Sequence, residues 1–313
     1  MKANTRLASV ILTICLFLFP GFSQVVLAQS DYDGVFIFGD SLSDAGNIYA
    51  LTGETSKAPY SLIPSRPYAM GGHHFSNGKT WAERFAQSLK ENNGGRASWD
   101  NPGRNGNYAH GGARARSGGP SAAPSSTQQA GMFLGDFGGA PTDALYVVQF
   151  GGNDVRDALT GNPADAPLVL FNAISDVSAT IQMLHAAGAR NFLVANAPNI
   201  QHAPAVQLAG PAAVAGAGIL VTQYNLGLEG ALISLDGLPG INIRRLDMGG
   251  FIDEVVTDPG SFGFTNVTAP CLVFFTESDA KCDDPENYLF WDGIHPTSHA
   301  HKTLADRALE AIQ

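Results

Sequence analysis

The chain has 313 residues, 44% of them hydrophobic and 15% charged, and its formal net charge is −10 at pH 7. This composition excludes a disordered chain, and the length is enough for one large α/β domain or two small ones, of which we expect one. Because nucleic acids and anionic membranes attract basic patches, the acidic balance disfavours both as partners.

The chain begins with the layout of a secretory signal peptide. Basic residues precede an apolar run over residues 8–19, and small or apolar residues occupy positions 26–28. A retained membrane anchor is the alternative, but a proline and a glycine interrupt the run before it reaches the roughly 20 residues that a span needs. We therefore predict a signal peptide over residues 1–28 and one domain over residues 29–313, secreted or periplasmic, without stable membrane insertion.

Five apolar runs are predicted β-strands, and five amphipathic or apolar patterns are predicted helices. The strands lie at residues 34–38, 107–109, 144–150, 191–195 and 241–246. The helices lie at residues 79–90, 126–137, 168–187, 211–235 and 297–312. Nearly continuous apolar runs are typical of parallel strands that are covered on both faces. The alternation therefore predicts a three-layer α/β/α sandwich around a central, mostly parallel five-stranded sheet.

Polar clusters follow three of the predicted strands. They are Gly39-Asp40-Ser41, His110-Gly111-Gly112 and Gly151-Gly152-Asn153-Asp154, and a fourth cluster, Asp292-Gly293-Ile294-His295-Pro296, opens the last helix. Ligands of an open parallel sheet bind beyond the carboxyl ends of its strands. The clusters would bring a hydroxyl, hydrogen-bond donors, a carboxylate and an imidazole to that edge.

Ser41, Asp292 and His295 are candidates for nucleophilic catalysis. A serine near neutral pH needs an imidazole to take its proton and a third group to hold that imidazole. The three-residue spacing of Asp292 and His295, at the entrance to a helix with Pro296 in its first turn, lets both side chains project to one side. The alternative for this cluster is a capped helix start with both side chains solvated.

Acyl transfer also needs fixed donors for the negative oxygen of its tetrahedral intermediate. Gly112 is a candidate backbone donor, Asn153 a candidate amide donor, and the N–H of Ser41 the third. The choice between Gly111 and Gly112 stays open, and ordinary strand-to-helix geometry is the alternative for both glycine-rich turns.

Four sequence words carry a resemblance to a known family. No G-x-S-x-G elbow occurs, but "FGDSLSDAGN", "NYAHGGA", "GGND" and "DGIHPT" appear in this order across nearly the whole predicted domain. The chain thus resembles the GDSL or SGNH hydrolases, a family of esterases and lipases. The resemblance implies a flavodoxin-like sheet, a nucleophile at Ser41, and a base at His295 oriented by Asp292. It also implies an oxyanion hole completed by Gly112 and Asn153.

From this resemblance we expect hydrolysis of carboxylic esters through an acyl-enzyme, with no metal or organic cofactor. Small-molecule, lipid and acetylated-sugar esters all remain open as substrates, because acyl preference depends on segments 49–78 and 155–167, which are expected to be loops. Two alternatives remain. One is a zinc-dependent hydrolase that uses Asp292, His295, His299 and His301. The other is a carbohydrate- or lipid-binding module that kept the fold without the reaction.

The cysteines suggest one structural bridge. Cys15 lies in the predicted signal peptide, which leaves Cys271 and Cys282 as an even pair in an exported protein. We predict a disulfide that steadies the nearby loop carrying Asp292 and His295. Two free buried thiols are the alternative.

The remaining polar residues of the clusters are predicted to be structural. A carboxylate beside a turn usually accepts backbone N–H bonds, which is the role expected for Asp40 and Asp154, and for Asp44 in a local turn cap. Arg114 and Arg116 are expected on a solvated loop.

Overall fold

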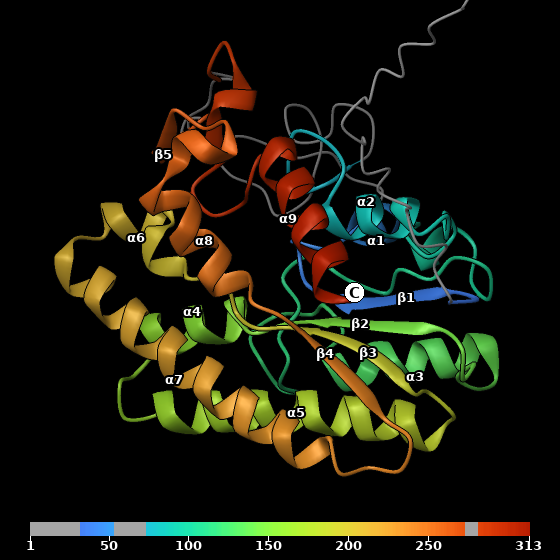
Figure 1. Ribbon diagram of the computed structural model, residues 1–313. Helices are drawn as coiled ribbons and strands as arrows, with labels where there is room; N and C mark the ends of the chain where they lie inside the picture. Colours follow the sequence, from blue (N-terminus) through green and yellow to red (C-terminus); the bar gives the residue numbers. More distant parts are fainter. Residues whose placement is uncertain (1–31, 53–72, 273–280) are drawn as a thin grey trace, which may run out of the picture.

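The computed structural model describes residues 32–52, 73–272 and 281–313. The predicted signal peptide at residues 1–28 lies outside these ranges. The described part folds around one parallel sheet with helices on both faces, which confirms the predicted three-layer class (Figure 1).

Four parallel strands form the sheet. In spatial order they are β1 (Val35–Gly39), β2 (Leu145–Gln149), β3 (Asn191–Ala195) and β4 (Asn242–Leu246). They pair in register, so that Gly39 lies opposite Gln149 and Gln149 opposite Ala195 at the carboxyl ends. The polar clusters that follow β1 and β2 therefore lie at the same edge.

A short fifth segment continues the sheet beyond β1. Asn107 forms an isolated parallel bridge with Ile37, and the N–H groups of Tyr108 and His110 donate to the carbonyls of Ile37 (2.7 Å) and Gly39 (3.1 Å). The five segments thus follow the spatial order 2-1-3-4-5 of flavodoxin-like sheets. The predicted strand at residues 107–109 is present only as this bridge. Polar side chains and turns hold the chain around it, in place of a continuous ladder of backbone hydrogen bonds.

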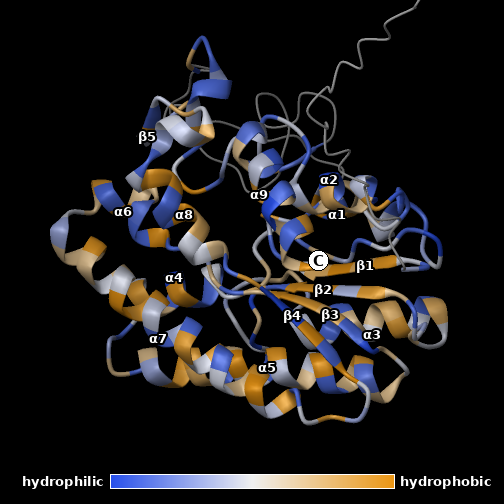
Figure 2. Ribbon diagram, viewed as in Figure 1, coloured by the Kyte–Doolittle hydropathy of each residue, from blue (hydrophilic) through white to orange (hydrophobic). Residues whose placement is uncertain are grey.

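The two faces of the sheet bury different helices. Phe36 and Phe38 point into one core and Val35 and Ile37 into the other, as the period of two along a strand requires. The first core packs against α3 (Ser126–Phe137), α4 (Gly152–Thr160), α5 (Ala166–Ala186) and α7 (Pro211–Leu235). The second packs against α2 (Trp81–Ser88), α8 (Met248–Thr257) and α9 (Ser298–Ala311). Figure 2 shows β1 and β2 as mainly hydrophobic ribbons between these layers.

Helix boundaries follow local signals closely. A capping box of Ser125 and Gln128 begins α3, and Gly138, with a φ of +73°, ends it in the left-handed conformation. Proline at the first position begins α7. Among the described residues, α5 alone is long and apolar enough to cross a membrane, and it packs against α3, α4 and α7.

Several short elements were not predicted. They are α1 (Asn47–Thr52), α4, α6 (Pro204–Leu208), α8, and the strands β5 (Asn266–Pro270) and β6 (Tyr288–Phe290), which pair in a second small sheet. Single 3₁₀ turns lie at Ser98–Asp100, Ile200–His202, Pro259–Phe262 and Pro285–Asn287. The predicted loop at residues 155–167 is wrong in its first half, because Val155 and Ala158 anchor α4 in the core.

Candidate active site

Ser41, His295 and Asp292 form one hydrogen-bonded chain at the carboxyl edge of the sheet. The Nε2 atom of His295 lies 2.9 Å from the Oγ atom of Ser41, although the two residues are 254 positions apart. The Nδ1 atom of His295 lies 2.8 Å from Oδ2 of Asp292. All three residues are buried. The three predicted residues are therefore brought together, in the order that proton transfer from a serine requires.

A tight turn, and not the following helix, sets the relation between Asp292 and His295. Oδ1 of Asp292 accepts the N–H groups of Ile294 and His295, each at 2.7 Å. Helix α9 begins only at Ser298, after the cap residue Thr297. The expectation that Pro296 lies in the first helical turn is therefore wrong, but the turn achieves the same alignment.

The Asp292 carboxylate is suited to hold an imidazole. Burial alone would raise its pKa, but the charge of His295 and the hydrogen bonds from His295 and Ile294 lower the pKa below its usual value. Asp292 is thus an acceptor near neutral pH and favours the tautomer that carries the proton on Nδ1 of His295.

Asp44 connects the turn after β1 to the Gly111-Gly112 turn. Oδ1 of Asp44 accepts the N–H groups of Gly46 and Asn47, as expected of a turn cap, but its Oδ2 accepts the N–H of Gly111 at 2.7 Å. The Gly111 amide is therefore occupied. The N–H of Gly112 donates to no acceptor within the described ranges, so Gly112 is the better candidate for an oxyanion donor.

Asn153 is the second residue of α4, directly after the end of β2 and its glycine turn. Its Nδ2 atom donates to the carbonyl of Ala113 at 2.8 Å. An amide has two N–H donors, so one can fix the orientation of the side chain while the other stays available to a ligand. Asn153 and Ser41 line the same cleft, which has a volume of about 500 Å³.

Two arginines bind the Gly112 loop to α4. Arg114 forms two hydrogen bonds with Asp157 (2.9 and 2.8 Å) and a third with the carbonyl of Gly112 (2.6 Å). Arg116 pairs with both Asp154 and Asp157 at 2.7 Å. The expected solvated loop is therefore wrong for both arginines, since they are mostly buried and paired. Asp154 is structural, as expected, and the ion pairs fix both candidate oxyanion donors relative to each other.

The four residues of the zinc alternative, Asp292, His295, His299 and His301, do not form a metal site. Nδ1 of His299 lies 2.6 Å from the carbonyl of Glu286, and Nδ1 of His301 accepts the N–H of Trp81 at 3.2 Å. Among the described residues, no group of three or more histidine, cysteine or acidic side chains could hold a metal ion.

A second groove, of about 460 Å³, lies between α7, α8 and β4 and is lined by Asn225 and Asp247 among others. Neither Ser41 nor His295 lines it, so the cleft at Ser41 is the one that can serve acyl transfer.

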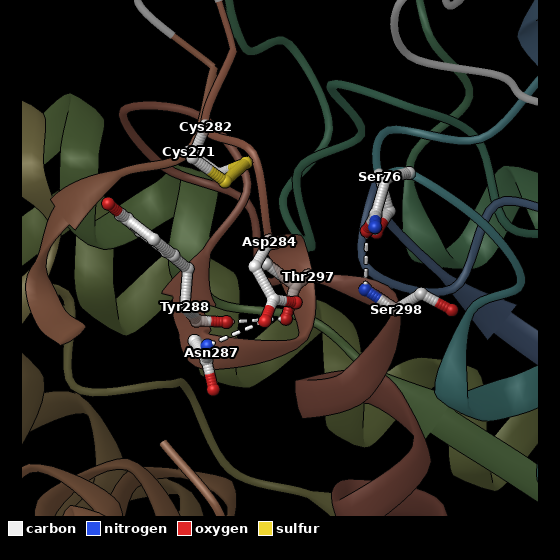
Figure 3. The surroundings of a disulfide bond; sticks show 9 residues. Ser76, Cys271, Cys282, Asp284, Asn287, Tyr288, Thr297 and Ser298 are labelled. Atoms are coloured by element: carbon white, nitrogen blue, oxygen red, sulfur yellow. Dashed lines mark hydrogen bonds between the residues drawn. A yellow bond between two sulfur atoms is a disulfide. The ribbon is translucent and has the colours of Figure 1, made fainter. Parts of the chain in front are cut away.

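Cys271 and Cys282 form the predicted disulfide. Figure 3 shows the bond together with Tyr288 and Thr297. The Thr297 hydroxyl donates to the Tyr288 carbonyl at 2.7 Å. The bridge thus lies beside the segment that leads into the Asp292 turn.

Backbone hydrogen bonds connect the bridge to that turn. The N–H of Cys271 donates to Phe290 (3.0 Å), and the N–H of Leu272 donates to Trp291 (2.6 Å), the residue directly before Asp292. Loss of the bridge would therefore loosen the support of the Asp292 turn.

We expect the double variant Cys271→Ser/Cys282→Ser to lose about 3 kcal/mol of folding stability, from the loop entropy of a bridge between residues 11 positions apart. Urea unfolding of the oxidised protein and the variant measures this loss. Reductant should destabilise the wild type by the same amount and leave the variant unaffected. Equal unfolding midpoints for variant and wild type would show that the bridge does not support the loop.

Asp40 lies directly before Ser41 and is almost fully buried, with Oδ1 accepting the N–H of Leu42 at 3.0 Å. Burial raises its pKa from 3.8 to about 6, although the Leu42 hydrogen bond opposes the shift. The folded chain therefore holds this proton more tightly than the unfolded chain does.

This raised pKa predicts a pH-dependent contribution to stability. The contribution is fully present below the unfolded pKa of 3.8, and about 3 kcal/mol is lost as pH rises through the folded pKa of about 6. The side chain of the Asp40→Asn variant cannot ionise, so the free energy of unfolding of the variant should rise relative to that of the wild type by about 2 kcal/mol between pH 4 and pH 7. Denaturant unfolding at both pH values measures the difference, and a constant difference would contradict the assigned shift.

Comparisons with known proteins show which family the chain is similar to. The family model "GDSL-like Lipase/Acylhydrolase" matches residues 35–308. A thermolabile hemolysin of Vibrio parahaemolyticus is 25% identical over 305 residues, covering 92% of this chain but 66% of that protein. A GDSL esterase/lipase of Arabidopsis thaliana is 25% identical over 336 residues, covering 96% and 95% of the two chains.

Two solved structures also align over most of the chain. One is LAE5, an alpha/beta hydrolase enzyme from the metagenome of Lake Arreo, with 15% identity, coverage of 91% and 99%, and a TM-score of 0.44. The other, from Parabacteroides merdae, carries the description of a GDSL-like lipase and aligns with 11% identity, coverage of 90% and 95%, and a TM-score of 0.43.

Proposed function

Because the chain belongs to the GDSL-like lipase/acylhydrolase family, a family of ester hydrolases, we propose that it is a serine hydrolase that cleaves carboxylic esters through an acyl-enzyme. The observation that carries this proposal is the buried chain of hydrogen bonds from Ser41 through His295 to Asp292. The proposed substrates are small-molecule or lipid esters.

In the proposed reaction, Ser41 Oγ attacks the ester carbonyl while His295 Nε2 takes its proton. His295 then gives that proton to the leaving alcohol, and the acyl group stays on Ser41. A water molecule repeats the sequence on the acyl-enzyme, releases the acid and restores the Ser41 hydroxyl. Asp292 stabilises the imidazolium that forms in each half of the reaction.

Three donors are proposed to bind the negative oxygen of each tetrahedral intermediate. They are the N–H groups of Ser41 and Gly112 and the side-chain amide of Asn153. The hydrogen bond from Asn153 to Ala113 supports this role, because a donor that is already oriented loses no free energy to reorganisation during the reaction.

We expect Asn153→Ala to lower kcat roughly 10²- to 10³-fold with little change in KM, because the lost donor acts mainly in the transition state. Steady-state kinetics on a short-chain nitrophenyl ester measures both constants. Asn162→Ala, at an exposed position soon after the same helix, is the matched control and should retain wild-type kcat. An unchanged kcat in Asn153→Ala would move the oxyanion donor to another residue.

One inhibition experiment separates this function from its alternatives. The wild-type protein should hydrolyse a nitrophenyl ester, keep its activity after prolonged chelation, and lose it to a serine-directed organophosphorus reagent. Loss on chelation would favour the zinc-dependent hydrolase. Ester binding without hydrolysis would favour a binding module.

Export is part of the proposal. A signal peptide over residues 1–28 would place the enzyme outside the cytoplasm. Sequencing the N-terminus of the exported protein should give Gln29 as the first residue, whereas a retained N-terminus would contradict cleavage.

A further inference from the structure

The ring of Phe75 packs against both the His295 imidazole and the backbone of Gly111. The ring centroids of Phe75 and His295 are 5.3 Å apart, and the two ring planes are inclined by 40°. A Cβ atom added to Gly111 would lie only 2.1 Å from Cε2 of Phe75, so the ring fills the space that a side chain at position 111 would need. Phe75 is 3% exposed. One buried aromatic ring therefore supports the proposed acid–base group.

Hydrogen bonds fix the residues after Phe75 to the start of α9. The Ser76 hydroxyl donates to the carbonyl of Pro296 at 2.9 Å. Oδ1 of Asn77 accepts the N–H of Ser298, the first residue of α9, at 2.6 Å. Figure 3 shows Ser76 close to Ser298. The partners are 220 and 221 positions apart along the chain, so the ring of Phe75 is held in place from outside its own segment.

The segment that carries Phe75 also leads into α2, which packs against α9. Thr80 and Glu83 form a capping box at the start of α2. Nε2 of His74 lies 2.7 Å from Oε2 of Glu83, and Nη2 of Arg84 donates to the hydroxyl of Ser298 at 2.6 Å. Helices α2 and α9 therefore form a rigid frame for this segment.

Hydrogen bonds hold the imidazole of His295 at both nitrogen atoms only while Ser41 is unmodified. Nδ1 lies 2.8 Å from Asp292, and Nε2 lies 2.9 Å from the Ser41 oxygen. In the proposed acyl-enzyme, the Ser41 oxygen carries the acyl group in place of its proton, so Nε2 loses that partner. Asp292 then holds the ring at Nδ1 alone, and packing must keep Nε2 aimed at the water that attacks the acyl group.

We propose that Phe75 is a positioning residue, whose ring keeps the His295 imidazole in its reactive orientation after Ser41 has been acylated. This inference rests on the proposed acyl-enzyme mechanism. In deacylation, the water oxygen bonds to the acyl carbon while a water proton passes to Nε2, and that proton then passes to the Ser41 oxygen as the acid leaves. A small rotation of the imidazole would slow both transfers. Phe75 itself neither takes nor gives a proton.

The test compares Phe75→Leu with the matched control Phe264→Leu. Phe264 is also buried, and its ring lies 4.5 Å from the imidazole of His299, which has no role in the proposed reaction. Both variants replace a buried phenylalanine that packs on a histidine, so urea unfolding should show similar losses of folding stability. A difference in turnover between them therefore reports on His295 and not on the fold.

Stopped-flow measurements on a nitrophenyl ester separate the two halves of the reaction. A misplacement of about 1 Å can slow a reaction 10²-fold, and leucine restores part of the packing, so Phe75→Leu should lower the steady rate after the burst about tenfold. Because kcat/KM depends only on the steps up to acylation, it should fall less than about threefold. Phe264→Leu should keep both constants within about twofold of the wild type. Phe75→Met, which fills more of the space, should show a smaller loss of the steady rate.

Three results would overturn the positioning role. Equal steady rates for Phe75→Leu and Phe264→Leu would show that the ring is only structural. A rise in KM at unchanged kcat would assign Phe75 to substrate binding. In a His295→Ala background, Phe75→Leu should change the residual rate less than about twofold, and a full tenfold loss there would mean that the ring acts through the Gly111 turn.

Failure of the proposed function would look different from failure of this inference. The wild type would then cleave no ester and show no burst, or Ser41→Ala would cleave the ester as fast as the wild type does.

Discussion

Replacing Ser41 with alanine is expected to lower kcat for ester hydrolysis by roughly 10⁶-fold, the size of effect found when a catalytic serine is removed from a complete triad. The reason is chemical: alanine has no oxygen to attack the carbonyl, and His295 then has no proton to take. Single-turnover and steady-state assays on a nitrophenyl ester, with purified protein free of host esterases, measure the loss.

Ser43→Ala is the matched control for this variant. Ser43 lies two residues further along the same turn, where its hydroxyl donates to Gln149 (2.8 Å) and accepts from Trp81 (3.1 Å). Its loss should cost roughly 1–3 kcal/mol of stability, because Trp81 loses a buried partner, with a far smaller effect on kcat. Comparable activity in Ser41→Ala and the wild type would remove Ser41 from the chemistry.

The second large effect is expected from Asp292→Asn, which should lower kcat about 10⁴-fold. An asparagine has nearly the same shape, and its oxygen can still accept the backbone N–H groups of Ile294 and His295. Its amide cannot stabilise the imidazolium, however, and its N–H group facing Nδ1 favours the wrong tautomer of His295. The measurement is kcat for a short-chain ester, together with thermal unfolding to show that the fold is retained.

Asp284→Asn provides the matched control for that substitution. Asp284 is an exposed carboxylate near the disulfide, and its Oδ2 accepts from Asn287 at 2.7 Å (Figure 3). We expect wild-type kcat for this variant. If Asp292→Asn kept the same activity as Asp284→Asn, another group would have to orient His295.

The sequence predicted the layers of the fold, and the structure brings the candidate residues Ser41, His295 and Asp292 together. The catalytic role of these residues stays a prediction. Apolar runs predicted the four main strands, and the helical patterns at residues 126–137 and 211–235 predicted α3 and α7. The elements that were missed are short, and α4 opens with the polar residues Asn153 and Asp154 after Gly152. The packing of Val155 and Ala158 against the core stabilises α4.

The supports of the site could not be predicted from one sequence, because they join residues that are distant along the chain. Arg114 and Asp157 are 43 positions apart, and nothing in the loop around Arg114 indicates a buried partner. The hydrogen bond from Gly111 to Asp44 spans 67 positions, and this contact is what favours Gly112 over Gly111. The acidic residues Asp154 and Asp157, which follow β2 closely, are the signal from which partners for Arg114 and Arg116 could have been sought.

The most direct test of this account is to trap the acyl-enzyme. Acid quenching during turnover of a slowly hydrolysed nitrophenyl ester should leave one acyl group per chain, which peptide mass mapping should locate on Ser41, with an early burst of one nitrophenolate per enzyme. An acyl group on any other residue would contradict the acyl-enzyme at Ser41. Steady hydrolysis in which Ser41 is never acylated and does not react with a serine-directed reagent would contradict it as well.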